Sequence, residues 1–308
     1  MTDLVIDHLT KQFGETRAVD DLSFTVRPGV VTGFLGPNGS GKSTTMRALL
    51  DLIAPTAGSA TFAGRRYREL DDPALQVGAL LEADAFHPGR SGRDHLRILA
   101  ASARLARTRV DEVLELVGLT DAADRAAGGY SLGMRQRLGL AAALLGDPQV
   151  LILDEPANGL DPQGVRWLRD LLRHHAERGA TVLVSSHLLA EMALIADEVV
   201  VIRSGRLVTH DRVAAITATA KGRAVLVRSP QPDVLATALR AAGAVVDPGS
   251  DGELLVRSVD TPTIARVALR EGVEVHELTP RSASLEEAFL ELTDETTAIE
   301  AAVTSTPI

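Results

Sequence analysis

Short apolar runs alternate with amphipathic stretches over the first two thirds of the chain. This alternation predicts a layered α/β domain. Continuous apolar runs are typical of strands buried on both faces of a parallel sheet. Predicted strands with a largely apolar character occupy residues 30–35, 76–82, 150–153 and 181–186, the second ending in Glu82 and the fourth in two serines. The first and third are followed by residues with helical spacing, in 45–50 and 164–178, which favours a sheet with helices packed against it.

Residues 84–147 have a different pattern. Apolar positions recur with a helical period in residues 94–105 and again in 110–117. Asp94 stands where a helix cap is expected. We therefore predict a mostly helical insert that interrupts the α/β domain, the domain as a whole covering residues 1–217.

Residues 218–294 form a second predicted unit. Their apolar segments follow the order β-α-β-β-α-β, which is typical of a small ferredoxin-like α+β module. A last helix is expected over residues 284–293. Residues 295–308 have the character of a loose, flexible tail. The second unit contains neither a phosphate loop nor a metal-ligand cluster in its sequence, so a regulatory or assembly role is expected for it.

Composition narrows the choice of function. The chain has 308 residues, 45% of them hydrophobic, and a net charge of −9, which argues against a nucleic-acid partner. No apolar run approaches the about 18–20 residues of a membrane span, and the N-terminus lacks the features of a signal peptide. We therefore expect a cytoplasmic chain. The absence of cysteine excludes disulfides and thiolate metal sites.

A glycine-rich loop follows the first buried run and precedes a helix, which is the context of a phosphate-binding loop. Glycines let backbone N–H groups face a phosphate, and the helix adds its positive end. The candidate residues are Gly36, Pro37, Asn38, Gly39, Ser40, Gly41, Lys42, Ser43 and Thr44. Lys42 would face the outer phosphates, and the Ser43 hydroxyl is a candidate Mg²⁺ ligand. The chain has 29 arginines and only 3 lysines, one of which stands at this position.

Acidic residues end another buried strand. Asp154 and Glu155 come directly after residues 150–153, in the pattern known as Walker B. Asp154 is expected to hold Mg²⁺ and Glu155 to polarise an attacking water. His187 follows the strand at 181–186, on the sheet edge where α/β proteins bind ligands, so we expect it to contact the nucleotide phosphate.

Two further positions are open to more than one interpretation. Ser131 stands at a helix start, and its local pattern alone is best explained as an ordinary N-cap. Phe13 either stacks on an adenine ring or covers a sheet edge. Its place just upstream of the phosphate loop favours stacking.

Taken together, these motifs resemble the ABC ATPase cassette in order and spacing. The resemblance covers residues 3–215 and includes the phosphate loop, Ser131 with Gly133, Asp154 with Glu155, Asp161 and His187. It implies ATP and Mg²⁺ as cofactors. It also implies a homodimer or paired cassette in which Ser131 and Gly133 of one copy contact the ATP held by the other, with Asp161 in the turn beside the nucleotide.

Two positions depart from the common pattern. Leu132 and Met134-Arg135 replace glycine and glutamine in the signature, and Glu82 replaces a glutamine at a strand end, where we expect it at the Mg²⁺–water shell.

The C-terminal unit, including residues 284–289, is similar to that of ATPase subunits from bacitracin and daunorubicin exporters. The resemblance implies an ATP hydrolase that drives drug or antibiotic efflux through a membrane permease on a separate chain, at the inner face of the cell membrane. Permease contact is expected near residues 82–96.

Three different functions compete with this interpretation. A soluble ABC ATPase of translation or DNA repair is less consistent with a single phosphate loop. A P-loop kinase or GTPase is less consistent with the Ser131–Gly133 signature and with His187. An importer subunit would share the whole cassette, and the C-terminal unit favours an exporter over it.

Overall fold

The computed structural model describes residues 2–219, 224–249, 252–281 and 285–289, and the chain divides into two compact units, Met1–Arg212 and Val213–Ile308. The division lies slightly before the boundary predicted after residue 217, which falls inside helix α8 (Val213–Thr219). Residues 285–289 are helical, and the predicted tail at 295–308 lies outside the described residues.

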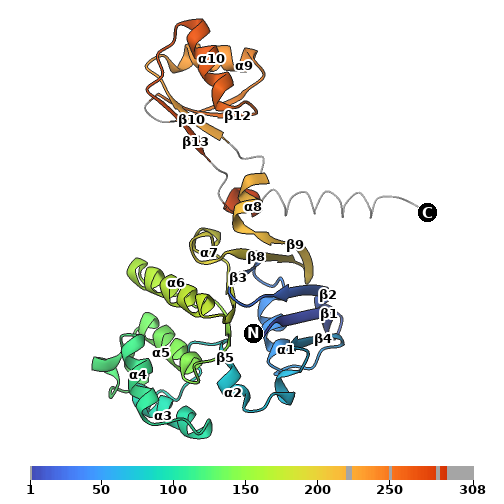
Figure 1. Ribbon diagram of the computed structural model, residues 1–308, viewed down its shortest axis with the longest axis vertical. Helices are drawn as coiled ribbons and strands as arrows, with labels where there is room; N and C mark the ends of the chain where they lie inside the picture. The colour runs from blue at the N-terminus through green and yellow to red at the C-terminus, as the bar shows by residue number, and fades with distance from the viewer. Residues whose placement is uncertain (1, 220–223, 250–251, 282–284, 290–308) are drawn as a thin grey trace, which may run out of the picture. The chain divides into compact units, whose positions relative to one another are not determined.

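A six-stranded sheet forms the centre of the first unit (Figure 1). Its strand order is β5-β6-β7-β3-β8-β9, and all neighbours are parallel except β8 and β9. The strands are β3 (Val31–Leu35), β5 (Val77–Leu80), β6 (Val150–Leu153), β7 (Thr181–Ser186), β8 (Glu198–Arg203) and β9 (Arg206–Arg212). Every residue of β3, β6 and β7 is buried, which is why these strands are largely apolar in the sequence, although β7 also buries Ser185 and Ser186.

A smaller antiparallel sheet lies beside it, with strand order β2-β1-β4. Its strands are β1 (Leu4–Phe13), β2 (Thr16–Val26) and β4 (Ala57–Phe62). Helix α1 (Lys42–Leu49) contributes Met46 and Leu49 to a core cluster that also contains Phe24 of the small sheet and Phe34 of the large one. The rings of Phe24 and Phe34 lie 5.3 Å apart between centroids, so one core joins both sheets to α1.

The region predicted as a helical insert contains α3 (Gly92–Ser102), α4 (Thr108–Leu116) and α5 (Leu132–Leu144), which gather on the side of the unit away from the small sheet (Figure 1). The cap of α3 differs from the prediction. Ser91, not Asp94, is the N-cap, since its hydroxyl accepts a hydrogen bond from the Asp94 backbone N–H. Asp94 lies in the first helical turn, where its charge favours the helix dipole. The remaining helices of this unit are α2 (Pro73–Gln76), α6 (Pro162–Glu177) and α7 (Leu189–Ile195), with 3₁₀ turns at Tyr67–Glu69, Thr120–Ala122 and Ala127–Gly129.

The second unit has the predicted element order after α8. The elements are β10 (Ala224–Arg228), α9 (Pro232–Ala241), β11 (Val245–Pro248), β12 (Glu253–Arg257), α10 (Thr261–Glu271) and β13 (Glu277–Arg281). The four strands form one antiparallel sheet in the order β11-β12-β10-β13, a ferredoxin-like arrangement. Alternate strand residues, such as Val225 and Val227, pack with Leu235 and Ile264 of the two helices. None of the helices in the described part of the chain has the length and apolar character needed to span a lipid bilayer.

Candidate nucleotide-binding and hydrolysis site

The glycine-rich loop joins β3 to α1, as predicted. Gly41 precedes the helix with a φ of 106°, and no side chain caps the first-turn N–H groups. A Cβ at Gly41 would lie 2.4 Å from the Ala18 carbonyl oxygen, and one at Gly36 would lie 2.5 Å from that of Ile202. Only glycine fits this path. The loop therefore presents an uncapped helix N-terminus, which suits a phosphate group.

Lys42 supplies the positive charge of the loop. Its side chain is buried, and its ammonium group donates hydrogen bonds to the carbonyl oxygens of Gly36 (2.7 Å) and Pro37 (3.2 Å). Burial lowers the pKa of Lys42, and the carboxylates of Glu155 and Asp154 act in the opposite direction. The loop carbonyls thus hold the cation within the phosphate cradle.

Asp154 connects three parts of the site. Its carboxylate accepts a hydrogen bond from the Ser43 hydroxyl at 2.7 Å and another from the Ser185 hydroxyl at the end of β7. Hydroxyl and carboxylate oxygens are the ligands that Mg²⁺ prefers. Over the residues that the structure describes there is no cluster of three or more histidine, cysteine or acidic side chains.

Both the backbone and the carboxylate of Glu155 make hydrogen bonds within the site. Its φ is 51°, a left-handed conformation uncommon for a residue other than glycine. Its backbone N–H donates to the Ser185 hydroxyl at 3.0 Å. Its carboxylate contacts Nδ1 of His187 and accepts from the Asn158 amide at 2.9 Å. The structure therefore brings Glu155 and His187 together, with His187 directly against the carboxylate. The expected contact of His187 with the nucleotide phosphate stays a prediction.

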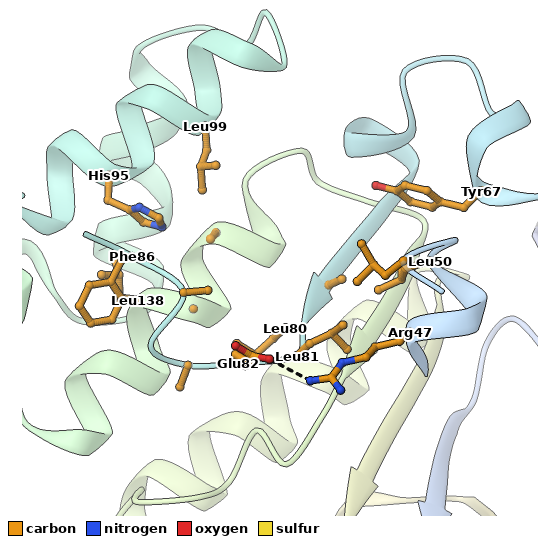
Figure 2. Close-up of a pocket in the computed structure, with 16 residues that line it drawn as sticks. Arg47, Leu50, Tyr67, Leu80, Leu81, Glu82, Phe86, His95, Leu99 and Leu138 are labelled. Carbon is orange, nitrogen blue, oxygen red and sulfur yellow. Dashed lines mark hydrogen bonds and ion pairs between the residues drawn. The ribbon is translucent and has the colours of Figure 1, made fainter. Parts of the chain in front are cut away.

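Glu82 contacts Arg47 and makes no contact with Asp154. Its exposed carboxylate pairs with Arg47 of α1 at 2.9 Å, beside the segment that follows β5 (Figure 2). The structure shows no contact of Glu82 with Ser43 or Asp154, so its expected place at the Mg²⁺–water shell stays a prediction. The sequence does not single out Arg47, because nothing in a helical arginine indicates a distant carboxylate partner.

The remaining predicted residues lie at the end of strand β1 and at the starts of helices α5 and α6. Phe13 is half exposed at the end of β1, with the Lys11 ammonium 4.8 Å from its ring centroid. Ser131 is the N-cap of α5 and accepts from the backbone N–H of Met134. A Cβ on Gly133 would lie 2.8 Å from the carbonyl oxygen of Gly159. The N-cap of α6 is Asp161, which accepts from the Gly164 backbone N–H at 2.7 Å and so has a structural contact of its own.

Some residues of the site are not evident in the sequence. They are Gln136, Asn158 and Ser185, all of which contact Glu155. Ser185 ends a parallel strand next to β6, and this neighbouring strand end places it beside the Walker B carboxylates. Gln136 is a buried residue of α5 that stands between Arg135 and Arg137, so the sequence gives no signal that its side chain faces the interior of the fold.

The fold and these contacts define a P-loop nucleotide hydrolase with a helical insert. The family model described as ABC transporter matches residues 19–158, and a domain of unknown function matches residues 223–286. The chain belongs to the ATP-binding proteins of ABC transporters. It is an ATP-binding protein and an ATP hydrolase of the ABC type, and the predicted family and fold class are confirmed.

The relatives support this assignment over nearly the whole chain. An uncharacterized ABC transporter ATP-binding protein of Bacillus subtilis is 38% identical over 96% of this chain and 97% of its own length. A daunorubicin resistance ATP-binding protein of Streptomyces coeruleorubidus is 35% identical over 95% and 96%. The bacitracin transport ATP-binding protein of Bacillus licheniformis is 43% identical over 65% and 66%. A solved ATP-binding subunit of an ABC transporter superposes with a TM-score of 0.64 at 26% identity, covering 69% of this chain and 91% of that one.

Proposed function

We propose that this chain is the ATPase subunit of an exporter, which drives a membrane permease encoded as a separate chain and moves a drug or antibiotic out of the cell. The observation that carries this proposal is the 35% identity to the daunorubicin resistance protein, which extends through the C-terminal unit. The bacitracin transport protein, 43% identical over 65% of this chain, is a second relative whose name refers to transport of an antibiotic.

The proposed chemistry uses ATP and Mg²⁺. The loop from Gly36 to Thr44 wraps the phosphates, with Lys42 at the outer ones. Ser43 and Asp154, whose side chains meet at 2.7 Å, would hold Mg²⁺, and the ion when bound would neutralise charge on the phosphate oxygens. Glu155 takes the proton of an attacking water, and its carboxylate is oriented for this by His187 and Asn158. Phe13, at the exposed end of β1, stacks on the adenine ring.

The site is completed by a second copy in this proposal. Ser131 and Gly133 lie at the start of α5, a helix whose first-turn N–H groups suit an anion. They face the γ-phosphate held by the other copy, and Asp161 lies in the turn next to this contact. Two composite sites result, and closure of the dimer excludes bulk water from both while the attacking water stays beside Glu155.

A pocket of about 430 Å³ offers a surface for the permease. It opens between α5, α3 and the segment after β5, and its lining is mainly apolar, with Leu81, Phe86, Leu99 and Leu138 among the side chains (Figure 2). The Glu82–Arg47 ion pair lies in the same lining. We assign this pocket to a cytoplasmic segment of the permease, which would place the chain at the inner face of the membrane and carry the motion of the helical insert to the transporter.

In this proposal the second unit, from about residue 218 to 294, is an accessory domain that serves assembly or regulation. Its described sheet face carries cross-strand ion pairs such as Arg228–Glu253 and Arg257–Asp247. These are contacts of a folded module with a solvated face.

The test is co-purification of the full chain with the membrane protein encoded beside it, followed by ATPase measurements with candidate drugs. Export predicts a stable complex whose ATPase activity rises with at least one antibiotic or anthracycline. A matched variant, Leu81→Glu, places a charge in the apolar pocket and should lower the yield of complex while ATP affinity stays unchanged. A chain that never binds a membrane protein, and associates with ribosomes or DNA, would exclude the exporter assignment.

A further inference from the structure

A buried amide lies between the signature residues and the proposed base. Gln136 is 3% exposed and belongs to α5, the helix that Ser131 caps. Its Nε2 donates a hydrogen bond of 3.1 Å to the backbone carbonyl oxygen of Glu155. A buried amide is retained where a specific partner satisfies it, and here that partner is the peptide of the proposed general base.

The peptide of Glu155 needs such partners. A left-handed conformation in a residue with a side chain persists only where surrounding contacts fix it. The N–H group is fixed by the Ser185 hydroxyl, and the carbonyl oxygen accepts from Gln136 and, at 3.2 Å, from the backbone N–H of Asn158. Of these donors to the carbonyl, only Gln136 comes from the helical insert.

A second contact joins the start of α5 to the turn after Glu155. Gly159 has a φ of 75°, and a Cβ there would lie 2.4 Å from Cγ of Leu132. Gly133 makes the reciprocal close approach, since its own Cβ would meet the Gly159 carbonyl oxygen. The first turns of α5 and the turn at 155–159 are therefore packed without room for independent movement.

We propose that Gln136 is a positioning residue that sets the Glu155 carboxylate, and that it links this carboxylate to the signature of the same chain. Ser131 and Gln136 are on one helix, so a shift of α5 when Ser131 meets the neighbouring nucleotide moves the donor that holds Glu155. Each chain then couples the base of its own site to the contact it makes with the other site. This inference rests on the role of Glu155 given under the proposed function.

The test measures kcat, KM and affinity for a non-hydrolysable ATP analogue in the full chain carrying Gln136→Met. This substitution keeps the length of the side chain and removes the donor. The expected result is a fall in kcat of about 10- to 100-fold, the size of effect that a misplaced catalytic group produces, with unchanged analogue affinity. Leu140→Met is the matched control, a buried residue of α5 outside the site, and should retain kcat.

A second variant separates positioning from packing. The carboxyl introduced by Gln136→Glu donates to the Glu155 carbonyl only while protonated, so its kcat relative to wild type should rise as the pH falls from 8 to about 6. A flat ratio, or wild-type kcat in Gln136→Met, overturns the inference. Equal losses of kcat and analogue affinity also overturn it, because they indicate a structural role. Glu155→Gln is measured alongside: full turnover in that variant removes the base assignment itself, whereas an inactive Glu155→Gln beside a normal Gln136→Met removes only the link.

Discussion

Replacement of Glu155 by glutamine is expected to stop turnover while ATP still binds. The change removes one oxygen and the negative charge but keeps the shape of the side chain. The amide oxygen can still accept from Asn158, and the backbone contacts with Ser185 and Gln136 do not involve the carboxylate. The local fold should therefore persist, and the loss should appear in the chemical step.

The magnitude follows from the role of the group. Loss of a general base lowers the rate by about 10²- to 10⁴-fold, which corresponds to about 2.7–5.4 kcal/mol of activation free energy. Binding should not weaken, because Lys42 keeps its loop contacts and Asp154 remains beside it as a second carboxylate. Removing a negative charge near the phosphates reduces electrostatic repulsion, so any change in ATP affinity should be an increase.

The assay compares steady-state turnover, ATP affinity and molecular mass. With ATP and Mg²⁺, Glu155→Gln should bind ATP, close and remain dimeric. A double variant that adds Ser131→Arg should bind ATP and stay monomeric, because the arginine blocks the contact between copies. Wild-type turnover in Glu155→Gln would refute the catalytic role of this residue. A dimer that survives Ser131→Arg would refute the composite site.

Three other perturbations test separate parts of the molecule. Lys42→Ala should abolish most of the ATP affinity measured by calorimetry, because Lys42 carries the buried ammonium group of the phosphate loop. An unchanged affinity would contradict this. Glu82→Gln should leave ATPase activity largely intact, since the amide oxygen can still accept from Arg47, and a complete loss would show that the charge is required. Burial lowers the pKa of His175 below the ordinary value of about 6.5. The negative charge of Asp147 raises this pKa, and the positive charges of the neighbouring Arg178, His174 and Arg109 lower it further. The unfolded state therefore binds more protons below that pH, so the melting temperature should fall as the pH drops from 7 toward 5, and His175→Gln should flatten this dependence.

The sequence determined the elements and the residue types of the site. Unbroken apolar runs require strands covered on both faces, and a glycine-rich loop with a lysine requires a backbone that curls around an anion. These are local consequences of side-chain size, period and backbone freedom. For the same reason the β-α-β-β-α-β order of the second unit was predicted correctly.

Contacts between distant segments were decided only by the tertiary structure. The sequence places Glu82 and Arg47 on different elements, and only the packing of α1 beside the end of β5 makes them an ion pair. It gives no sign that the Gln136 amide reaches the Glu155 carbonyl, because this requires α5 to lie beside the segment that follows β6. Hydrogen bonds of this kind depend on three-dimensional distance and direction, which spacing along the chain does not record. The physical reason is that local patterns fix which elements form, whereas the close packing of those elements fixes which of their polar groups meet.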